Sequence, residues 1–166
     1  LQTKSYEIQK LDRIDVFLNG LHVGTALNEV VLHSSRVAKI QGFEIEIDGS
    51  VADRFRGDGV IIATPTGSTS YAMSVGAPIL YPTMQSHIIV PMAAYRIGAR
   101  PLVIPSKYNI KAKITGHPEA VMVIDGQDEI MIKKEDDLEF KKSKESVELI
   151  RFKDNFFDKV KDKLRV

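Results

Sequence analysis

A run of hydroxyl-bearing residues follows an apolar segment in the first half of the chain. Val60-Ile61-Ile62-Ala63 predicts a buried strand, and Thr64-Pro65-Thr66-Gly67-Ser68-Thr69 places four hydroxyl groups directly after it. Hydroxyls and free backbone N–H groups at the start of a following helix can bind a phosphate, a ribose or an adenine edge. The same residues can instead serve only to cap that helix, so the spacing alone leaves both interpretations open. No Lys follows Gly67, so the loop does not match the phosphate-binding loop of nucleoside triphosphatases.

Other kinds of chemistry are excluded by residues that are missing or scattered. The chain contains no cysteine, which rules out disulfides, thiolate nucleophiles and Cys-ligated metal sites. Its histidines have no paired spacing and no adjacent carboxylate cluster, so we expect no metal site at His22, His33, His87 or His117. The 23 basic and 22 acidic residues balance, which argues against a nucleic-acid partner and favours a small-molecule ligand.

Most of the chain alternates short apolar stretches with turn residues, which predicts a mainly β fold. With 166 residues and 43% hydrophobic content we expect one domain with one core. Asn19-Gly20 between two such stretches predicts a type I′ hairpin. The stretches are too many for one open sheet, so we expect two packed antiparallel layers, a β-sandwich-like domain. The expected strands are residues 14–18, 21–23, 30–32, 43–47, 60–63, 88–90, 102–104, 108–114, 121–124, 129–132, 138–142 and 147–152.

Two segments depart from this pattern and predict helices. Residues 68–75 lack strict alternation, and Gly67-Ser68-Thr69 before them and Gly76 after them suit the N-cap and the exit of one short helix. Near the end, apolar residues recur at helical spacing behind Asp154, with basic residues through Arg165 that suit a helix C-terminus. The apolar positions of this expected docking helix are Phe156, Phe157, Val160 and Leu164.

The two ends and the hydropathy of the chain bear on its location. No apolar run has the length of a signal core or a membrane span, so we expect a soluble protein, and the absence of cysteine fits the cytoplasm. The chain does not begin with Met. We therefore expect Leu1 to be an internal boundary of a longer protein.

The string Asp58-Gly59-x-x-x-x-Thr64-Pro65-Thr66-Gly67-Ser68-Thr69-x-Tyr71 resembles the signature of the NAD kinase family. Further segments resemble later and earlier family landmarks in order and spacing, from about Leu11 to the final helix: residues 26–33, 76–80, 100–103 and 125–127. The resemblance implies a two-layer β domain, the C-terminal half of the enzyme, that binds NAD and takes part in a homo-oligomer, a dimer or a tetramer. The intact enzyme phosphorylates the 2′-hydroxyl of the adenosine ribose of NAD and gives NADP.

The resemblance also implies roles for individual side chains. Asn28 and Glu29 would orient the hydroxyls of the adenosine ribose, and Asp58 would contact the nicotinamide end. The cations that would approach the dinucleotide and offset its pyrophosphate are Lys39 and Arg56. The adenine and ribose side of the pocket would be lined by Thr69, Ser70, Tyr71 and Ser74, and a late ligand-contacting position by Gln127.

The family's catalytic aspartate belongs to a Gly-Gly-Asp-Gly motif that is missing from these residues. Gly57-Asp58-Gly59 is similar to part of that motif, but Arg56 precedes it and it belongs to the strand region described above. The resemblance therefore places the base in the protein's own N-terminal domain, with ATP or polyphosphate as phosphoryl donor and Mg²⁺ or another divalent cation. We expect these residues alone to bind a dinucleotide without turnover.

One departure and two alternatives accompany the resemblance. Pro91 is followed by Met92-Ala93-Ala94-Tyr95 where bacterial members usually reach a Pro-His step, which indicates an archaeal-type pocket. The first alternative is the C-terminal half of a lipid kinase of the diacylglycerol or sphingosine type, which would show an acyl-chain cleft. The second is a dinucleotide-binding module without catalysis.

Overall fold

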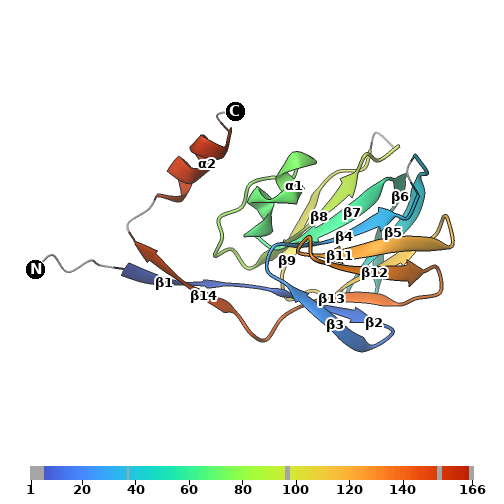
Figure 1. Cartoon of the computed structure of the whole chain (residues 1–166), viewed down its shortest axis with the longest axis horizontal. Coiled ribbons are helices and arrows are strands. Elements are labelled where there is room, and N and C mark those ends of the chain that lie inside the picture. Colours follow the sequence, from blue (N-terminus) through green and yellow to red (C-terminus); the bar gives the residue numbers. More distant parts are fainter. Residues whose placement is uncertain (1–5, 37, 96–97, 153–154, 165–166) are drawn as a thin grey trace, which may run out of the picture.

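The computed structural model describes residues 6–36, 38–95, 98–152 and 155–164. Within these residues two six-stranded antiparallel sheets pack face to face, and a separate two-stranded ribbon projects from them (Figure 1). The mainly β, two-layer fold expected from the alternation is therefore confirmed. The features expected at Leu1, Asp154 and Arg165 lie outside the described residues.

The first sheet contains two local hairpins, one of β2 (Ile14–Leu18) and β3 (Leu21–Ala26) and one of β5 (Gln41–Ile47) and β6 (Ser50–Gly57). Strands β13 (Leu138–Lys142) and β10 (Ile110–Ile114), which come later in the sequence, lie between these hairpins. The β2–β3 hairpin turns at Asn19 and Gly20, whose φ values of 52° and 79° are those that a type I′ turn requires. In spatial order the strands are β3 (Leu21–Ala26), β2 (Ile14–Leu18), β13 (Leu138–Lys142), β10 (Ile110–Ile114), β5 (Gln41–Ile47) and β6 (Ser50–Gly57).

The second sheet positions the candidate site. Its central strands β4 and β7 pair with Glu29 opposite Ala63 at one end and His33 opposite Gly59 at the other. We call the first the α1 end, after the short helix α1 (Tyr71–Ser74), and the second the far end. In spatial order the strands are β12 (Asp128–Lys133), β11 (Glu119–Ile124), β4 (Glu29–Ser34), β7 (Gly59–Ala63), β8 (Ser86–Met92) and β9 (Leu102–Pro105).

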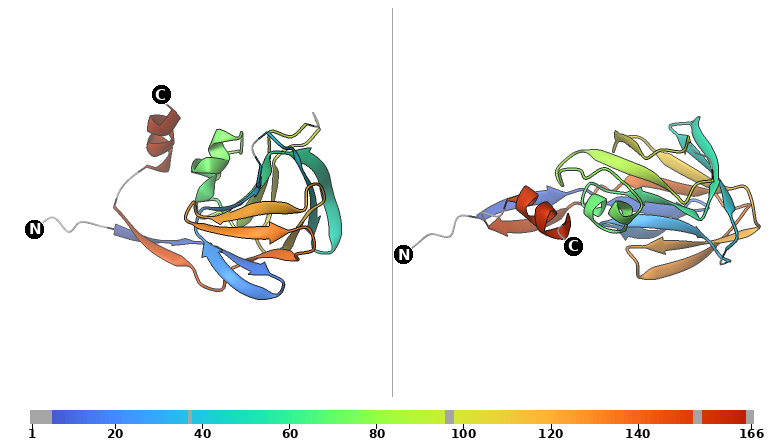
Figure 2. Two further views of the ribbon diagram at one scale, coloured as in Figure 1. Left: turned by 45° about the vertical axis from the view of Figure 1, so that its right-hand side comes forward. Right: turned by 90° about the horizontal axis from the view of Figure 1, so that it is seen from above.

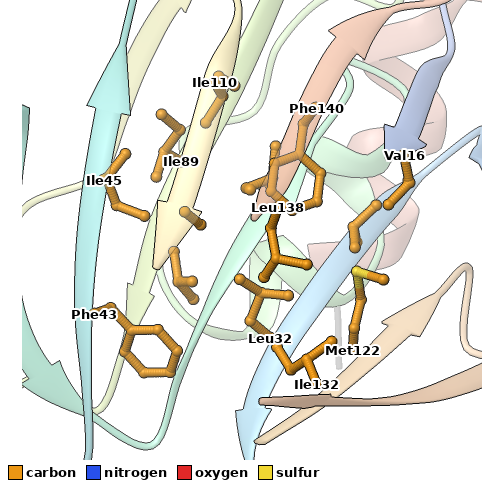
Figure 3. Packing of buried hydrophobic residues seen from close by; sticks show 14 of the residues in the cluster. Val16, Leu32, Phe43, Ile45, Ile89, Ile110, Met122, Ile132, Leu138 and Phe140 are labelled. Atoms are coloured by element: carbon orange, nitrogen blue, oxygen red, sulfur yellow. The ribbon is translucent and has the colours of Figure 1, made fainter. Parts of the chain in front are cut away.

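The main core lies between the two sheets (Figure 3). Phe43 and Phe140 enter it from the first sheet, and Leu32 and Met122 enter it from the second, each at most 1% exposed. Burying a side chain of this size stabilises the fold by about 1.5–3 kcal/mol. Because alternate residues of β4 face this core, the other residues of β4 face away from it toward α1.

The short helix expected over residues 68–75 is two separate turns. A 3₁₀ turn (Gly67–Thr69) is followed by α1 (Tyr71–Ser74), and Ser70 between them has φ −101° and ψ −135°, outside the helical range. The expected N-cap is wrong, because the Ser68 and Thr69 hydroxyls donate back to the carbonyls of Pro65 and Thr66. The helix after the loop is nevertheless present, and it ends as expected at Gly76, where φ is +87°.

The ribbon consists of β1 (Tyr6–Leu11) and β14 (Val147–Phe152), paired in register from Tyr6 opposite Phe152 to Leu11 opposite Val147. Figure 2 shows that it extends away from the two sheets. The expected C-terminal helix is present as α2 (Phe156–Leu164). Phe156 and Phe157 contact the ring of Tyr81, with ring centroids 5.1 and 6.3 Å apart. Neither α1 nor α2 has the length and apolar character that crossing a membrane requires.

One polar side chain is enclosed without a partner near the base of the ribbon. His87 of β8 is fully buried, and neither ring nitrogen has a hydrogen-bond partner among the described residues. This burial lowers the pKa of His87 to about 4, although Asp12 acts in the opposite direction. Lys142, which pairs with Asp12 at 2.7 Å, also lowers it. His87 is therefore neutral in the folded protein at physiological pH.

We predict that His87 makes folding sensitive to acid. The unfolded chain binds a proton at His87 near pH 6.5 and the folded chain only near pH 4, so stability is lost as pH falls through this window. The expected loss is about 3 kcal/mol between pH 7 and pH 4. Urea unfolding at both pH values should show a smaller loss for His87→Leu, whereas the control His117→Gln should behave like wild type. Equal losses in wild type and His87→Leu would contradict the prediction.

Candidate functional site

Three segments that are distant in sequence meet at the α1 end of the second sheet. They are the start of β4 at residues 27–29, the hydroxyl-rich loop of residues 64–70 after β7, and the turn at Asp125-Gly126 between β11 and β12. Asp125 and Gly126 have φ values of 48° and 68°, which form a tight turn whose carboxylate points at the start of β4. Hydrogen bonds from the turn and from the loop to residues 27–29 fix this junction.

Two residues satisfy the whole backbone of Leu27-Asn28-Glu29. The carboxylate of Asp125 accepts the N–H of Leu27 at 2.7 Å, that of Asn28 at 2.8 Å and that of Glu29 at 3.0 Å. The Thr64 hydroxyl donates to the carbonyl of Leu27 (2.6 Å), and the Thr64 N–H donates to that of Asn28 (2.8 Å). The N–H of Asp125 donates to the carbonyl of Glu29 (3.0 Å). All six backbone polar groups are thereby paired, and the side chains of Asn28 and Glu29 are not used for this purpose.

The loop approaches this segment so closely that position 67 has to be glycine. A Cβ atom at Gly67 would lie 2.1 Å from the carbonyl oxygen of Asn28. The Gly67 N–H is in turn held by the hydroxyl of Thr64 at 3.2 Å. The glycine of the Thr-Gly-Ser step therefore lets the loop lie directly on the backbone of Asn28.

Glu29 is a buried carboxylate with one oxygen unused. Its residue is 6% exposed, its Oε1 accepts the hydroxyl of Ser70 at 3.1 Å, and its Oε2 has no partner among the described residues. Burial raises the pKa of Glu29; the Ser70 hydroxyl opposes this rise, the nearby Asp125 carboxylate adds to it, and the Tyr71 backbone N–H opposes it. A buried acceptor without a donor is costly for the free protein, and such a group suits a ligand that brings a hydroxyl.

Most hydroxyls of the loop are occupied within the protein. The hydroxyl of Ser68 donates to the carbonyl of Pro65 and accepts the N–H of Leu80, and that of Thr69 donates to the carbonyl of Thr66. The hydroxyl of Thr64 bonds the β4 segment, as described above. The hydroxyl of Thr66 differs, because it is buried and has no partner among the described residues. Among the described residues of the loop, Thr66 therefore carries the hydroxyl that the fold leaves unpaired.

The other residues expected at the site surround this junction at the surface. Tyr71 is 45% exposed on α1, so it is not a core residue, and its ring is accessible. Ser74 is exposed on the same helix, and Gln127 is exposed two residues after Asp125. The side chain of Asn28 makes no hydrogen bond with the residues that the structure describes. Together with Glu29, Thr69 and Ser70 these residues form the α1-end group.

The structure separates the remaining three predicted residues from that group. Asp58 precedes β7 at the far end, where its carbonyl accepts the N–H of Ser34 and its N–H donates to the carbonyl of Met92. Ser34 lies six residues along β4 from Asn28, a distance of about 20 Å at the usual strand rise. Arg56 and Lys39 are exposed at the same end, in the strand before Asp58 and in the loop after β4. Lys39, Arg56 and Asp58 form the far-end group.

Sequence reasoning missed two residues of the junction. Asp125 was recognised only as part of a turn before Gln127, since nothing local shows that its carboxylate reaches a segment 96–98 residues earlier. Thr66 belonged to the hydroxyl-rich string, but the string could not tell which hydroxyl stays unpaired. The signal for Asp125 was the Asp-Gly turn itself, which places an aspartate at a sheet end.

We predict that Glu29→Gln stabilises the free chain at neutral pH. The raised pKa of Glu29 means that the folded chain holds its proton more tightly than the unfolded chain, so ionisation costs stability as pH rises. Glutamine keeps an acceptor for Ser70 without a charge, and the expected gain is about 1 kcal/mol at pH 8.

This gain should be much smaller at pH 4, below the ordinary glutamate pKa of 4.5, because the unfolded chain then also binds most of a proton at Glu29. Denaturant unfolding at both pH values measures it, with the exposed Glu129→Gln as the control. A lower stability of Glu29→Gln than of wild type at pH 8 would refute the account of Glu29.

Known proteins are similar to this chain over most of its length. Residues 27–152 match the family described as the ATP-NAD kinase C-terminal domain. The NAD kinase of Methanosarcina acetivorans is 46% identical over 154 residues, covering 92% of this chain and 56% of that protein. The NAD kinase of Methanospirillum hungatei is 42% identical over 163 residues, covering 98% of this chain and 61% of that protein. Both relatives are archaeal, in agreement with the archaeal-type member expected above.

The fold agrees as well. The crystal structure of an NAD kinase from Archaeoglobus fulgidus in complex with ATP matches with a TM-score of 0.82 and 30% identity, covering 93% of this chain and 61% of that chain. This chain thus spans rather more than half the length of these proteins. These comparisons give no support to the lipid-kinase alternative. The family expected from the string between Asp58 and Tyr71 is confirmed, and the chain belongs to the ATP-NAD kinase C-terminal domain family.

Proposed function

We propose that this chain forms the NAD-binding half of an NAD kinase, which phosphorylates the 2′-hydroxyl of the adenosine ribose of NAD and yields NADP. The observation that carries the proposal is the unused oxygen of the buried Glu29 carboxylate. A ribose hydroxyl is a neutral donor that can fill this vacancy without adding a second charge beside Asp125. The relatives named NAD kinase support the same assignment.

The α1-end group suits an adenosine in shape and chemistry. Asn28 carries both a donor and an acceptor next to Glu29, so the pair can orient two neighbouring ribose hydroxyls. The exposed ring of Tyr71 can stack on adenine, and Ser74 lies one turn further along α1. We propose that Thr69, Ser70 and Gln127 border the same pocket and that the unpaired Thr66 hydroxyl faces it.

In the proposed reaction this chain holds and orients the acceptor hydroxyl. Phosphoryl transfer depends mainly on positioning and on stabilising charge, so a fixed ribose contributes directly to the rate. The base that takes the hydroxyl proton is proposed to come from the N-terminal domain, with ATP or polyphosphate as donor. All these reactants are water-soluble metabolites, so we propose the cytoplasm as the compartment.

A divalent cation such as Mg²⁺ would neutralise charge on the transferred phosphoryl group. The part of the chain that the structure describes contains no group of three or more His, Asp or Glu side chains that could hold a metal ion. These residues therefore do not fit a metal site.

We infer that the part of the longer relatives with no counterpart in this chain packs against the ribbon. A two-stranded ribbon is marginally stable by itself, and this one exposes apolar side chains, with Ile150 62% and Phe152 53% exposed. A groove of about 1080 Å³ lies between the ribbon and the loop of residues 81–85. Its lining combines Lys10, Lys144 and Arg151 with apolar side chains, as an interface between domains does.

We also propose a homo-oligomer in which one copy supplies the far-end group to the α1-end group of another. The two groups lie about 20 Å apart at opposite ends of the same strands, so within one copy the far-end group does not border the α1-end group. A second copy in a two-fold arrangement can bring Asp58, Arg56 and Lys39 to the nicotinamide and pyrophosphate of a nucleotide held by Asn28 and Glu29.

The first test is calorimetric titration of this chain with NAD, NADP and ATP. We expect saturable binding of the dinucleotides, with Asn28→Ala weakening NAD binding by about 1–3 kcal/mol because partner groups lose their hydrogen bonds. The matched control is Asn109→Ala, an exposed turn residue on the other sheet, which should bind like wild type. Unchanged affinity in Asn28→Ala would remove Asn28 from the site.

The same preparation tests catalysis. The chain alone should form no NADP from NAD and ATP, and a fusion to the N-terminal part of the Methanosarcina acetivorans relative should restore it. A fusion that binds NAD but remains inactive would favour the non-catalytic module instead. Turnover by the isolated chain would show that the base lies within these residues.

The oligomer makes a separate prediction about mixed variants. Asn28→Ala and Asp58→Ala should each bind NAD weakly when alone. Unfolding and refolding them together should form mixed dimers in which one site combines intact Asn28 with intact Asp58, about a quarter of all sites. Titration of the mixture should recover that fraction of tight sites. If the mixture binds no better than its components, the two groups do not meet across copies.

A further inference from the structure

Asp125 makes an unusual number of contacts with one short segment. Its two carboxylate oxygens accept three consecutive backbone N–H groups of Leu27-Asn28-Glu29, at 2.7, 2.8 and 3.0 Å, and its own N–H returns to the carbonyl of Glu29. The ladder between β11 and β4 begins only at Ile124 and Val30. The carboxylate therefore extends the support of β4 past the point where strand pairing ends.

The other sheet contains a matched turn that does not touch the candidate site. Asp48 and Gly49 form the β5–β6 turn with φ values of 46° and 82°, close to those of Asp125 and Gly126. The Asp48 carboxylate accepts the N–H of Asn109 at 2.9 Å, and its own N–H donates to the carbonyl of Asn109 at 3.0 Å. The two turns share residue types and backbone conformation, but the Asp48 carboxylate accepts one N–H group where that of Asp125 accepts three.

The segment held by Asp125 carries the two side chains that the proposed function places on the ribose. Glu29 is the first residue of β4 and Asn28 precedes it, at a strand end that is prone to fray. A change in the backbone dihedral angles of this segment would redirect both side chains, because the direction of each Cα–Cβ bond follows the backbone. Thr64 holds the carbonyls of Leu27 and Asn28, and the Asp125 carboxylate holds the three N–H groups of the segment.

We propose that Asp125 is a positioning residue of the dinucleotide site, whose carboxylate fixes the backbone of residues 27–29 so that Asn28 and Glu29 face the ribose together. This inference rests on the proposed function and adds a residue to it. Asp125 acts through the segment and does not itself contact the nucleotide.

The test compares matched substitutions in the two turns by NAD titration and thermal unfolding. Asp125→Gly and Asp48→Gly both remove a carboxylate without straining a positive-φ position, because glycine adopts it freely. Asp125→Asn keeps an Oδ1 acceptor for Asn28 and Glu29 and loses the bond to Leu27, and asparagine also tolerates this conformation. Asp125→Gly should lose more stability than Asp48→Gly, because it removes three side-chain hydrogen bonds and Asp48→Gly removes one.

NAD binding should distinguish the two Asp125 variants from Asp48→Gly. We expect the dissociation constant to rise about tenfold in Asp125→Asn and about a hundredfold in Asp125→Gly, and to stay within about twofold of wild type in Asp48→Gly. Amide hydrogen exchange of residues 27–29 should accelerate in the Asp125 variants alone. If wild type binds NAD and both Asp125 variants bind it equally well, the positioning role is wrong and the proposed function stands. If wild type does not bind NAD, the proposed function is wrong, and this inference falls with it.

Discussion

The closure of the backbone at Leu27-Asn28-Glu29 is the interaction on which the candidate site depends. A strand that starts inside a protein leaves N–H and C=O groups without ladder partners, and each such group costs about 1–3 kcal/mol if it stays unpaired. Here Asp125 and Thr64 satisfy all six groups from opposite sides. The side chains of Asn28 and Glu29 therefore take no part in pairing these backbone groups. The hydroxyl-rich loop can then lie against them because Gly67 has no side chain to collide with Asn28.

The same closure leaves the protein with an unfavourable charge. Holding Glu29 in a buried position beside Asp125 raises its pKa and gives one of its oxygens nothing to accept. A protein selected for stability alone would place an apolar or neutral residue there. Buried polar groups without a partner are concentrated at functional sites, where a ligand can supply the missing hydrogen-bond donor. The exposed ring of Tyr71 and the unpaired hydroxyl of Thr66 on the neighbouring loop agree with that interpretation.

Local patterns were sufficient for much of the fold and insufficient where partners are distant in sequence. The Asn19-Gly20 turn and the alternating strands depend on neighbouring residues, so they could be predicted. β6 was missed because it is an edge strand whose residues are mostly exposed and polar, with Phe55 as its buried anchor, and β1 for a similar reason. The break at Ser70 depends on Glu29, 41 residues earlier, and the role of Asp125 depends on a contact across almost 100 residues. The separation of Asp58 from Thr64 was foreseeable, however, since the predicted strand between them already places the two at opposite ends.

The ribbon determines where the two sheets are connected to the rest of the chain. Because Tyr6 lies directly opposite Phe152, the described chain enters and leaves the two sheets through adjacent strands. A host polypeptide needs to open by only one interstrand spacing, about 5 Å, to accommodate such a unit. Because the two connections are already adjacent, little chain entropy is lost in joining the two sheets to the rest of a polypeptide at this point. A domain connected in this way can acquire new neighbours by recombination while the hydrogen bonds around Asn28 and Glu29 remain untouched.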